Sequence, residues 1–189
     1  MVNKILQADA AISKKIRIPQ EARFWRTLAA FFAHSGDSWF WLSGLFFVWL
    51  LNRGEWHTHA ALLAAAIFIQ AVLVLSIKFT VRRSRPAGEW GAIYRNTDPH
   101  SFPSGHAVRA IMLAVMCWGL GLKPLATVLT LWVPLVSLAR VMLGVHYLID
   151  VVAGWILGIF IGLGILAIQP LLFSIFPFNL FLSMHLLSD

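Results

Sequence analysis

Five long apolar stretches, separated by polar connections, dominate the sequence. They occupy about residues 37–53, 60–80, 104–122, 125–143 and 148–169. A helix needs about 20 apolar residues, each rising about 1.5 Å, to cross about 30 Å of hydrocarbon. All but the first stretch meet this length within a few residues. The first is shorter, but Trp39, Trp41 and Trp49 are spaced like interfacial anchors, so we predict that it spans as well.

The two ends of the chain carry different patterns. Before residue 37, apolar residues recur at helical spacing among basic ones and Pro19 interrupts them, which predicts two amphipathic helices on the membrane surface. After Pro170, an apolar stretch contains Pro177 and Asn179; it is either an interfacial tail or a sixth span, and we favour the tail. We therefore expect three regions: an interfacial segment 1–36, a transmembrane core 37–169 and an apolar tail 170–189.

The composition favours an all-α, polytopic membrane protein. Apolar residues make up 59% of the 189 residues and charged residues 12%, whereas soluble globular proteins have about 25% charged residues. A soluble domain of this size could not bury so much apolar surface, which disfavours a soluble enzyme, a disordered chain and a nucleic-acid binder despite the net charge of +7. We expect a multi-pass bundle of about five spans, or six if the C-terminal stretch crosses. We predict no nucleic-acid partner and no obligate protein partner.

Three polar clusters stand out, because an Arg, Lys or Asp at the bilayer centre costs about 2.5–3.5 kcal/mol. They are Lys78-Phe-Thr-Val-Arg-Arg-Ser-Arg85-Pro86, Pro103-Ser104-Gly105-His106 and Arg140-Val-Met-Leu-Gly-Val-His146-Tyr-Leu-Ile-Asp150. One apolar stretch ends at the first cluster, and the next begins at the second. The chain then crosses twice and returns to the same face at the third. Counting the spans therefore predicts that all three clusters meet at one membrane surface.

The basic residues of these clusters favour binding of an anion. Lys78 and Arg85 are two helical turns apart and point the same way if the helix continues to Pro86. With Arg140 they concentrate three positive charges, each pair repelling by about 3 kcal/mol at about 6 Å and an effective dielectric of about 20. Guanidinium groups match phosphate oxygens especially well. The sequence therefore predicts a phosphate site.

The residues that begin the third apolar stretch favour the same ligand. Ser104 follows a proline and begins a helix, where free N–H groups and the helix dipole attract an anion. Gly105 allows close approach to the backbone.

Two histidines supply candidate reactive groups. His146 and Asp150 are four residues apart, so the carboxylate can hold one ring nitrogen while the other acts as a nucleophile. His106 can donate a proton to the leaving oxygen. We predict in-line attack by His146 on phosphorus, followed by hydrolysis of the phosphohistidine, with no metal and no cofactor.

Other ionisable residues receive no catalytic role at this stage. We interpret Arg82, Arg83 and Arg95 as side chains that extend toward lipid headgroups. His57 and His59 resemble a metal pair, but no carboxylate or thiol lies nearby in the sequence, so we interpret them as loop residues.

The order Lys-x6-Arg-Pro, Pro-Ser-Gly-His and Arg-x5-His-x3-Asp resembles the signature of the type 2 phosphatidic acid phosphatase (lipid phosphate phosphatase) superfamily, over about residues 78–150. The resemblance implies a membrane helical bundle that dephosphorylates lipid phosphates or pyrophosphates without a metal. It implies phosphate binding by Lys78, Arg85, Ser104, Gly105 and Arg140, with His106 as the acid, His146 as the nucleophile and Asp150 as its orienting partner. The chain departs from many relatives at Ala139, where they have serine.

The resemblance also implies the class of substrate: a polyprenyl pyrophosphate such as undecaprenyl pyrophosphate, a phosphatidate or a phosphatidylglycerophosphate. It places the site at the extracytoplasmic face of the cell membrane, whereas the distribution of Lys and Arg would place it in the cytoplasm; we follow the resemblance. Two alternatives remain open. One is a non-catalytic carrier or flippase that uses the same residues, and the other is an enzyme like the vanadium-dependent haloperoxidases of the same superfamily.

Overall fold

The computed structural model describes residues 2–88 and 98–175, and within them all regular elements are helices apart from one isolated bridge. The helices are α1 (Val2–Ile16), α2 (Arg23–Ser35), α3 (Ser38–Leu51), α4 (Glu55–Val81), α6 (Gly105–Gly119), α7 (Lys123–Met142) and α8 (Leu148–Ile175). The predicted all-α fold class is confirmed.

Among the described residues, three helices are long and apolar enough to cross a membrane: Glu55–Val81, Lys123–Met142 and Leu148–Ser174. The apolar helices α3 and α6 have 14 and 15 residues, which is shorter than the 17 or so that a span needs at about 1.5 Å per residue. The protein is therefore a membrane protein of helical type, and the number of five or six spans stays a prediction.

The ends of the chain agree with the predicted pattern only in part. α1 and α2 are separated by residues 17–22, which include Pro19, as the periodicity predicts. Their position on the membrane surface stays a prediction. α8 continues through Pro170 to Ile175 without the expected break. One proline removes only one helical hydrogen bond, and a membrane helix tolerates it where other groups satisfy the freed carbonyl. Residues 176–189 of the predicted tail lie outside the described residues.

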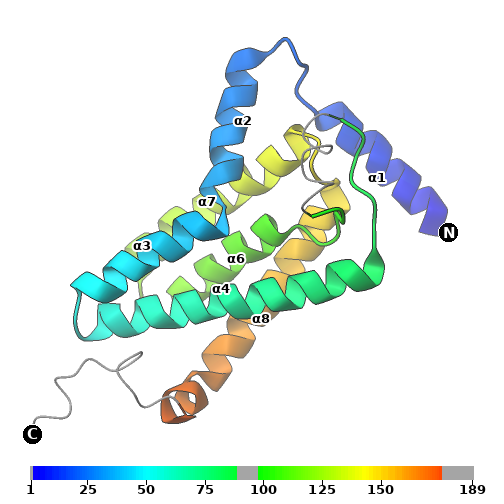
Figure 1. The fold of residues 1–189 in the computed structure, drawn as a ribbon. Helices are drawn as coiled ribbons and strands as arrows, with labels where there is room; N and C mark the ends of the chain where they lie inside the picture. Colours follow the sequence, from blue (N-terminus) through cyan, green and yellow to red (C-terminus); the bar gives the residue numbers. More distant parts are fainter. Residues whose placement is uncertain (1, 89–97, 176–189) are drawn as a thin grey trace, which may run out of the picture.

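α6 is the central helix of the bundle (Figure 1). It packs against α7 and α8, while α3 turns back along α4 and α2 packs on α7. The turns between α3 and α4 and between α6 and α7 are short, so neighbouring helices run in opposite directions. This alternation brings the C-terminal ends of α4 and α7 to the same end of the bundle as the N-terminal ends of α6 and α8.

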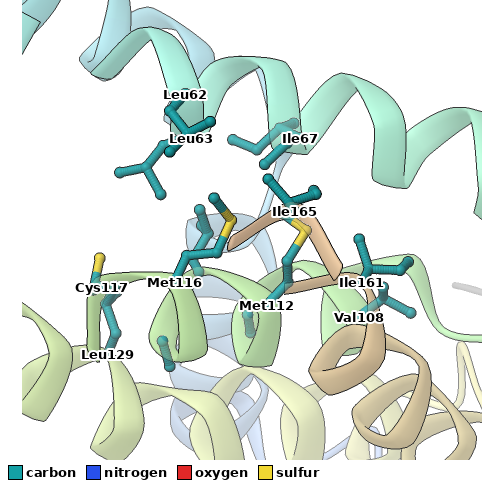
Figure 2. Packing of buried hydrophobic residues seen from close by; sticks show 14 of the residues in the cluster. Leu62, Leu63, Ile67, Val108, Met112, Met116, Cys117, Leu129, Ile161 and Ile165 are labelled. Carbon is teal, nitrogen blue, oxygen red and sulfur yellow. The ribbon is translucent and has the colours of Figure 1, made fainter. Parts of the chain in front are cut away.

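The core lies around α6 and is built from aliphatic and sulfur-containing side chains (Figure 2). Met112 and Met116 extend from α6 toward Leu62 and Ile67 of α4, and all four side chains are at most 1% exposed. Unbranched methionines fill the space between helices that cross at an angle. This packing fixes the position of α6, and therefore of its N-terminal residues.

The contact between α6 and α8 depends on glycines at every fourth position of α8, namely Gly154, Gly158 and Gly162. A Cβ at Gly154 would lie 3.0 Å from the Ser104 carbonyl oxygen, and one at Gly158 would overlap the Val108 carbonyl oxygen. Small residues at this spacing let two helix backbones approach closely in a membrane. This glycine stripe was not among the features predicted from the sequence.

Candidate active site

The ends of α3, α4, α6 and α7, together with Asp98 and His146 from connecting segments, line one polar cavity of about 250 Å³. Among the residues with predicted roles, those that line it are Lys78, Gly105, His106, Arg140 and His146. Residues 68 positions apart in the sequence thus lie at the same end of the bundle, as the counting of spans predicts. The cavity is also lined by Ser38, Gln70, Asp98 and Arg109, which the sequence analysis did not assign.

Lys78 and Arg85 lie close together, but not on one helix face as predicted. α4 ends at Val81, and Arg82 adopts the left-handed conformation with φ of 53°. The chain beyond it is extended and Ser84 forms an antiparallel bridge with His100. Arg85 therefore reaches the site from an extended segment. The reason is that α4 ends at Val81, about one turn before Pro86, where the sequence predicts its end.

Asp98 joins these two cations. Its Oδ2 atom accepts hydrogen bonds from Lys78 Nζ at 2.5 Å and from Arg85 Nη2 at 2.8 Å, while its carbonyl oxygen accepts from Arg85 Nε at 2.6 Å. The lysine and arginine side chains are 4% and 1% exposed, and the aspartate is 34% exposed. The carboxylate of Asp98 thus binds Lys78 and Arg85, the two cations that the sequence predicts to bind phosphate. No local pattern predicted this contact, because it joins residues across 20 positions.

His146 is 2% exposed and lies between the cations and Asp150. Its Nε2 atom is 3.3 Å from Arg85 Nη1, and its Nδ1 atom is 3.6 Å from Asp150 Oδ2. Burial, together with the positive charges of Arg140, Arg85 and Lys78, holds the pKa of His146 well below its usual range. The imidazole is therefore neutral near pH 7, with Nε2 on the side of the cations.

Asp150 has a stronger partner than the histidine. Its Oδ1 atom accepts a 2.6 Å hydrogen bond from Arg83, and its Oδ2 atom accepts one from the backbone N–H of Tyr147 at 2.9 Å. The 3.6 Å separation from His146 is ion-pair range but longer than a hydrogen bond. The carboxylate is held in place by Arg83, so the interpretation of Arg83 as a headgroup-facing side chain is wrong.

Arg83 also connects the site to α1. Its Nη2 atom donates to Asp9 at 2.6 Å, and its guanidinium lies 4.1 Å from the centre of the Tyr147 ring. Asp9 and Ser13 of α1 accept hydrogen bonds from the backbone N–H groups of Ile149 and Leu148 at the start of α8. The first helix therefore caps the helix that carries Asp150. The sequence signal for this role is Asp9 itself, which is the one carboxylate on an otherwise basic amphipathic helix.

The Pro-Ser-Gly-His cluster begins α6 as predicted. Ser104 is its N-cap, and the Ser104 N–H donates to the Asp150 carbonyl oxygen at 3.0 Å. Its Oγ atom is buried and makes no hydrogen bond within the described part of the chain. A Cβ at Gly105 would meet its nearest neighbour, Val74, only at 3.5 Å, which is ordinary contact. Protein packing therefore does not require glycine at this position beside the cavity.

His106 and Arg109, one turn apart on α6, both contact the junction between α2 and α3. His106 Nε2 lies 2.7 Å from Asp37 Oδ1, and Arg109 donates to the Gly36 carbonyl oxygen. Arg140, at the end of α7, is 2% exposed and lines the same cavity. Neither Arg109 nor Asp37 was predicted from the sequence to belong to the site.

Two other histidines differ from their prediction as loop residues. His57 and His59 lie in the first turns of α4, at the opposite end of that helix from Lys78. His57 Nδ1 is hydrogen-bonded to the Trp49 carbonyl oxygen at 2.8 Å.

Of the two other arginines that were predicted with Arg83 to extend toward headgroups, Arg82 is exposed, while Arg95 lies outside the described residues.

The family model of the PAP2 superfamily matches residues 59–174, which is more than half of the chain and includes all three polar clusters. The chain belongs to the PAP2 superfamily. Its resemblance to the phosphatidic acid phosphatase signature is thus confirmed at the level of the family.

Known PAP2 proteins extend this comparison. The decaprenylphosphoryl-5-phosphoribose phosphatase of Mycobacterium tuberculosis is 37% identical over 114 residues, and that of Mycolicibacterium smegmatis is 37% identical over 91 residues. The matches cover 59% of this chain and 59% of the first relative, and 48% and 49% for the second. The chain thus spans about three-fifths or less of the length of these curated relatives.

Two solved PAP2 structures share the fold. The phosphatidylglycerolphosphate phosphatase of Bacillus subtilis superposes with a TM-score of 0.72 at 24% identity, covering 89% of this chain and 87% of its own. LpxE of Aquifex aeolicus superposes with a TM-score of 0.62 at 25% identity, covering 86% and 94%. These likenesses support the arrangement of the PAP2 helices around the cavity.

Proposed function

We propose that this PAP2 protein is an integral-membrane phosphatase that hydrolyses a phosphate ester or pyrophosphate of an amphiphilic lipid through a phosphohistidine. The observation that carries the proposal is that His106 and His146 line one cavity together with Lys78 and Arg140. Two imidazoles around a cationic cavity can act as nucleophile and proton donor on opposite sides of a phosphorus atom.

In the proposed reaction, His146 Nε2 attacks phosphorus while the bond to the leaving oxygen breaks. His106 gives its proton to that oxygen and then takes a proton from the water that attacks the phosphohistidine. Lys78, Arg85 and Arg140 stabilise the charge on the equatorial oxygens, and Ser104 and Gly105 contact the phosphate at the N-terminus of α6. Asp150, fixed by Arg83, orients the His146 ring and stabilises its charged form.

The surroundings of the cavity support an amphiphilic substrate. Ser38, at the start of α3, lines the polar cavity, and the next residue, Trp39, lines an apolar hollow of about 400 Å³ between α3 and α4. A phosphate headgroup and an apolar tail would thus find matching surfaces on neighbouring residues. Because the two curated relatives are named for a polyprenyl-linked sugar phosphate, we rank polyprenyl phosphates above phosphatidate and phosphatidylglycerophosphate.

We further propose that the protein lies in the cell membrane with this cavity at the extracytoplasmic face. Several of the cations on the cavity side, among them Lys78, Arg85, Arg109 and Arg140, are at most 6% exposed. Charges that are buried at a site do not report topology in the way that loop charges do.

The test is release of inorganic phosphate in detergent from a panel of lipids. The panel contains decaprenylphosphoryl-5-phosphoribose, undecaprenyl pyrophosphate, a phosphatidate and a phosphatidylglycerophosphate. We expect turnover of at least one lipid, competitive inhibition by vanadate and no loss of rate with a chelator. Binding of these lipids without release of phosphate would instead support a carrier, and oxidation of halide in the presence of vanadate would support a haloperoxidase.

The contact of Asp98 with Lys78 and Arg85 leads to a separate prediction. Since its carboxylate competes with an incoming anion, we expect Asp98→Asn to bind vanadate about tenfold more tightly, which is about 1.4 kcal/mol. The backbone carbonyl that holds Arg85 Nε is retained in this variant. The inhibition constant of vanadate measures the effect. Weaker binding by the variant would mean that Asp98 assembles the cationic pair and does not compete for it.

A further inference from the structure

The junction between α2 and α3 places a carboxylate directly against His106. Asp37 Oδ1 lies 2.7 Å from His106 Nε2, and Asp37 Oδ2 lies 3.0 Å from His34 Nδ1. The side chains of His106 and Asp37 are 16% and 20% exposed, so water screens this pair only in part. Burial alone would raise the pKa of Asp37, but the hydrogen bonds and charges of His106 and His34 outweigh it and hold the pKa well below its usual range.

Neighbouring helices anchor this junction from several sides. Arg109 of α6 donates to the Gly36 carbonyl oxygen. Trp132 of α7 donates to Ser35 Oγ, and Trp41 of α3 donates to the Ser35 carbonyl oxygen, each at 2.9 Å. Residues 35 and 36, immediately before Asp37, are therefore bound by three helices. The carboxylate is delivered to His106 from a fixed backbone.

Gly36 lets the backbone approach the imidazole. A Cβ at this position would lie 2.9 Å from His106 Cδ2 and 3.0 Å from Val136 Cγ1. The φ angle of Gly36 is −89°, which any residue can adopt. Glycine is thus required here by the closeness of the ring and not by the backbone conformation.

We propose that Asp37 is the positioning residue of His106, a role that rests on the proposed phosphatase function. An ionised carboxylate only accepts hydrogen bonds, so it fixes the His106 proton on Nε2 and leaves Nδ1 for the substrate. Within the described residues, Asp37 is the hydrogen-bond partner of this ring. Its negative charge also stabilises the imidazolium against Arg109 and Arg140, which line the same cavity.

Each step of the proposed reaction conserves protons and electron pairs. As His146 Nε2 forms the bond to phosphorus, the electron pair of the breaking P–O bond goes to the leaving oxygen, which takes the proton from His106 Nδ1. His106 is then neutral, with its remaining proton on Nε2 toward Asp37. In the second step Nδ1 takes a proton from the attacking water, the P–N bond breaks, and its electron pair returns to His146. Asp37 stays ionised throughout.

The experiment compares two leaving groups. An alkyl lipid phosphate releases an alkoxide that needs a proton, whereas p-nitrophenyl phosphate releases a stable phenolate that does not. General acid catalysis contributes about 10²–10⁴-fold. We therefore expect Asp37→Asn to lower kcat for a short-chain phosphatidate about 100-fold or more, and kcat for p-nitrophenyl phosphate by less than about fivefold. Vanadate binding should be unchanged in this variant.

A second pair of variants tests the same role without changing the carboxylate. Gly36→Ala pushes the junction away from His106, so it should lower phosphatidate hydrolysis more than p-nitrophenyl phosphate hydrolysis. Gly164→Ala on α8 is the matched control, because a Cβ there meets nothing within 4 Å; both of its rates should equal those of the wild type.

Equal losses on both substrates, or normal rates in Asp37→Asn, would overturn the role of Asp37 while leaving a wild-type enzyme that is active. If the wild type released phosphate from neither substrate nor from the lipid panel, the proposed function itself would fail. Should Asp37→Asn not fold, Gly36→Ala beside Gly164→Ala carries the same comparison.

Discussion

Replacing His146 by alanine should lower phosphate release from the lipid substrate by about 10⁴-fold or more. Loss of a nucleophile that acts in concert with its partners removes most of the catalytic rate. Lys78, Arg85 and Arg140 remain in His146→Ala, so vanadate should still bind with an affinity within a few fold of the wild type. The measurement is single-turnover phosphate release in detergent, with vanadate inhibition or thermal stabilisation as the binding assay.

The control for this variant is His57→Ala. His57 lies at the other end of α4 and contacts Trp49 rather than the cavity. We expect its rate to stay within about twofold of the wild type. Appreciable turnover by His146→Ala would show that another group attacks phosphorus, and a loss of vanadate binding would show that the variant had lost the shape of the site.

The lowered pKa of His146 determines how the rate depends on pH. A nucleophilic imidazole is active when unprotonated, so lowering its pKa moves the acid limb of the profile to lower pH. The value of kcat/KM reports groups of the free enzyme. We therefore expect the acid limb of the kcat/KM profile to have its midpoint below pH 6.5, where an unperturbed histidine would be half protonated. An acid limb with its midpoint at pH 6.5 or above would contradict the burial and charges around His146.

The convergence of the polar clusters could be predicted from the sequence because it depends only on the number of crossings. Lys78 ends one apolar run, His106 begins the next, and Arg140 ends the one after that. Helices that alternate in direction bring these ends together whatever their exact packing. The all-α class followed from the apolar pattern, and the family from the resemblance of the three motifs.

The partners of the predicted residues could not be derived in this way. Asp37 contacts His106 across 69 positions, and Arg83 contacts Asp150 across 67. No periodicity links such pairs, since they depend on how the α2–α3 junction and the segment after α4 fold back. The left-handed turn at Arg82 had no local signal either, because glycine or asparagine is the usual residue there.

The stripe of Gly154, Gly158 and Gly162 was visible in the sequence, but its consequence depends on which helix faces it. The structure places α6 against it, with the Ser104 and Val108 backbone opposite the first two glycines. Because Ser104 begins the Pro-Ser-Gly-His helix and Asp150 lies one turn before Gly154, this contact sets the spacing of the site. Packing between α6 and α8 thus controls the geometry of the cavity.

Gly158→Ala should therefore destabilise the protein, although alanine favours helices by about 1 kcal/mol over glycine. The added Cβ would overlap the Val108 carbonyl oxygen and Ile111 Cγ2, and a backbone atom cannot move aside without separating the two helices. Overpacking of this kind costs about 3 kcal/mol or more. The net loss of about 2 kcal/mol lowers Tm by roughly 4–8 °C in a chain of this size.

Gly164→Ala, on the same helix with nothing within 4 Å of its Cβ, should leave Tm unchanged or raise it. Thermal unfolding followed by tryptophan fluorescence in detergent measures both variants. Equal Tm values for the two would show that α6 and α8 do not pack through this stripe.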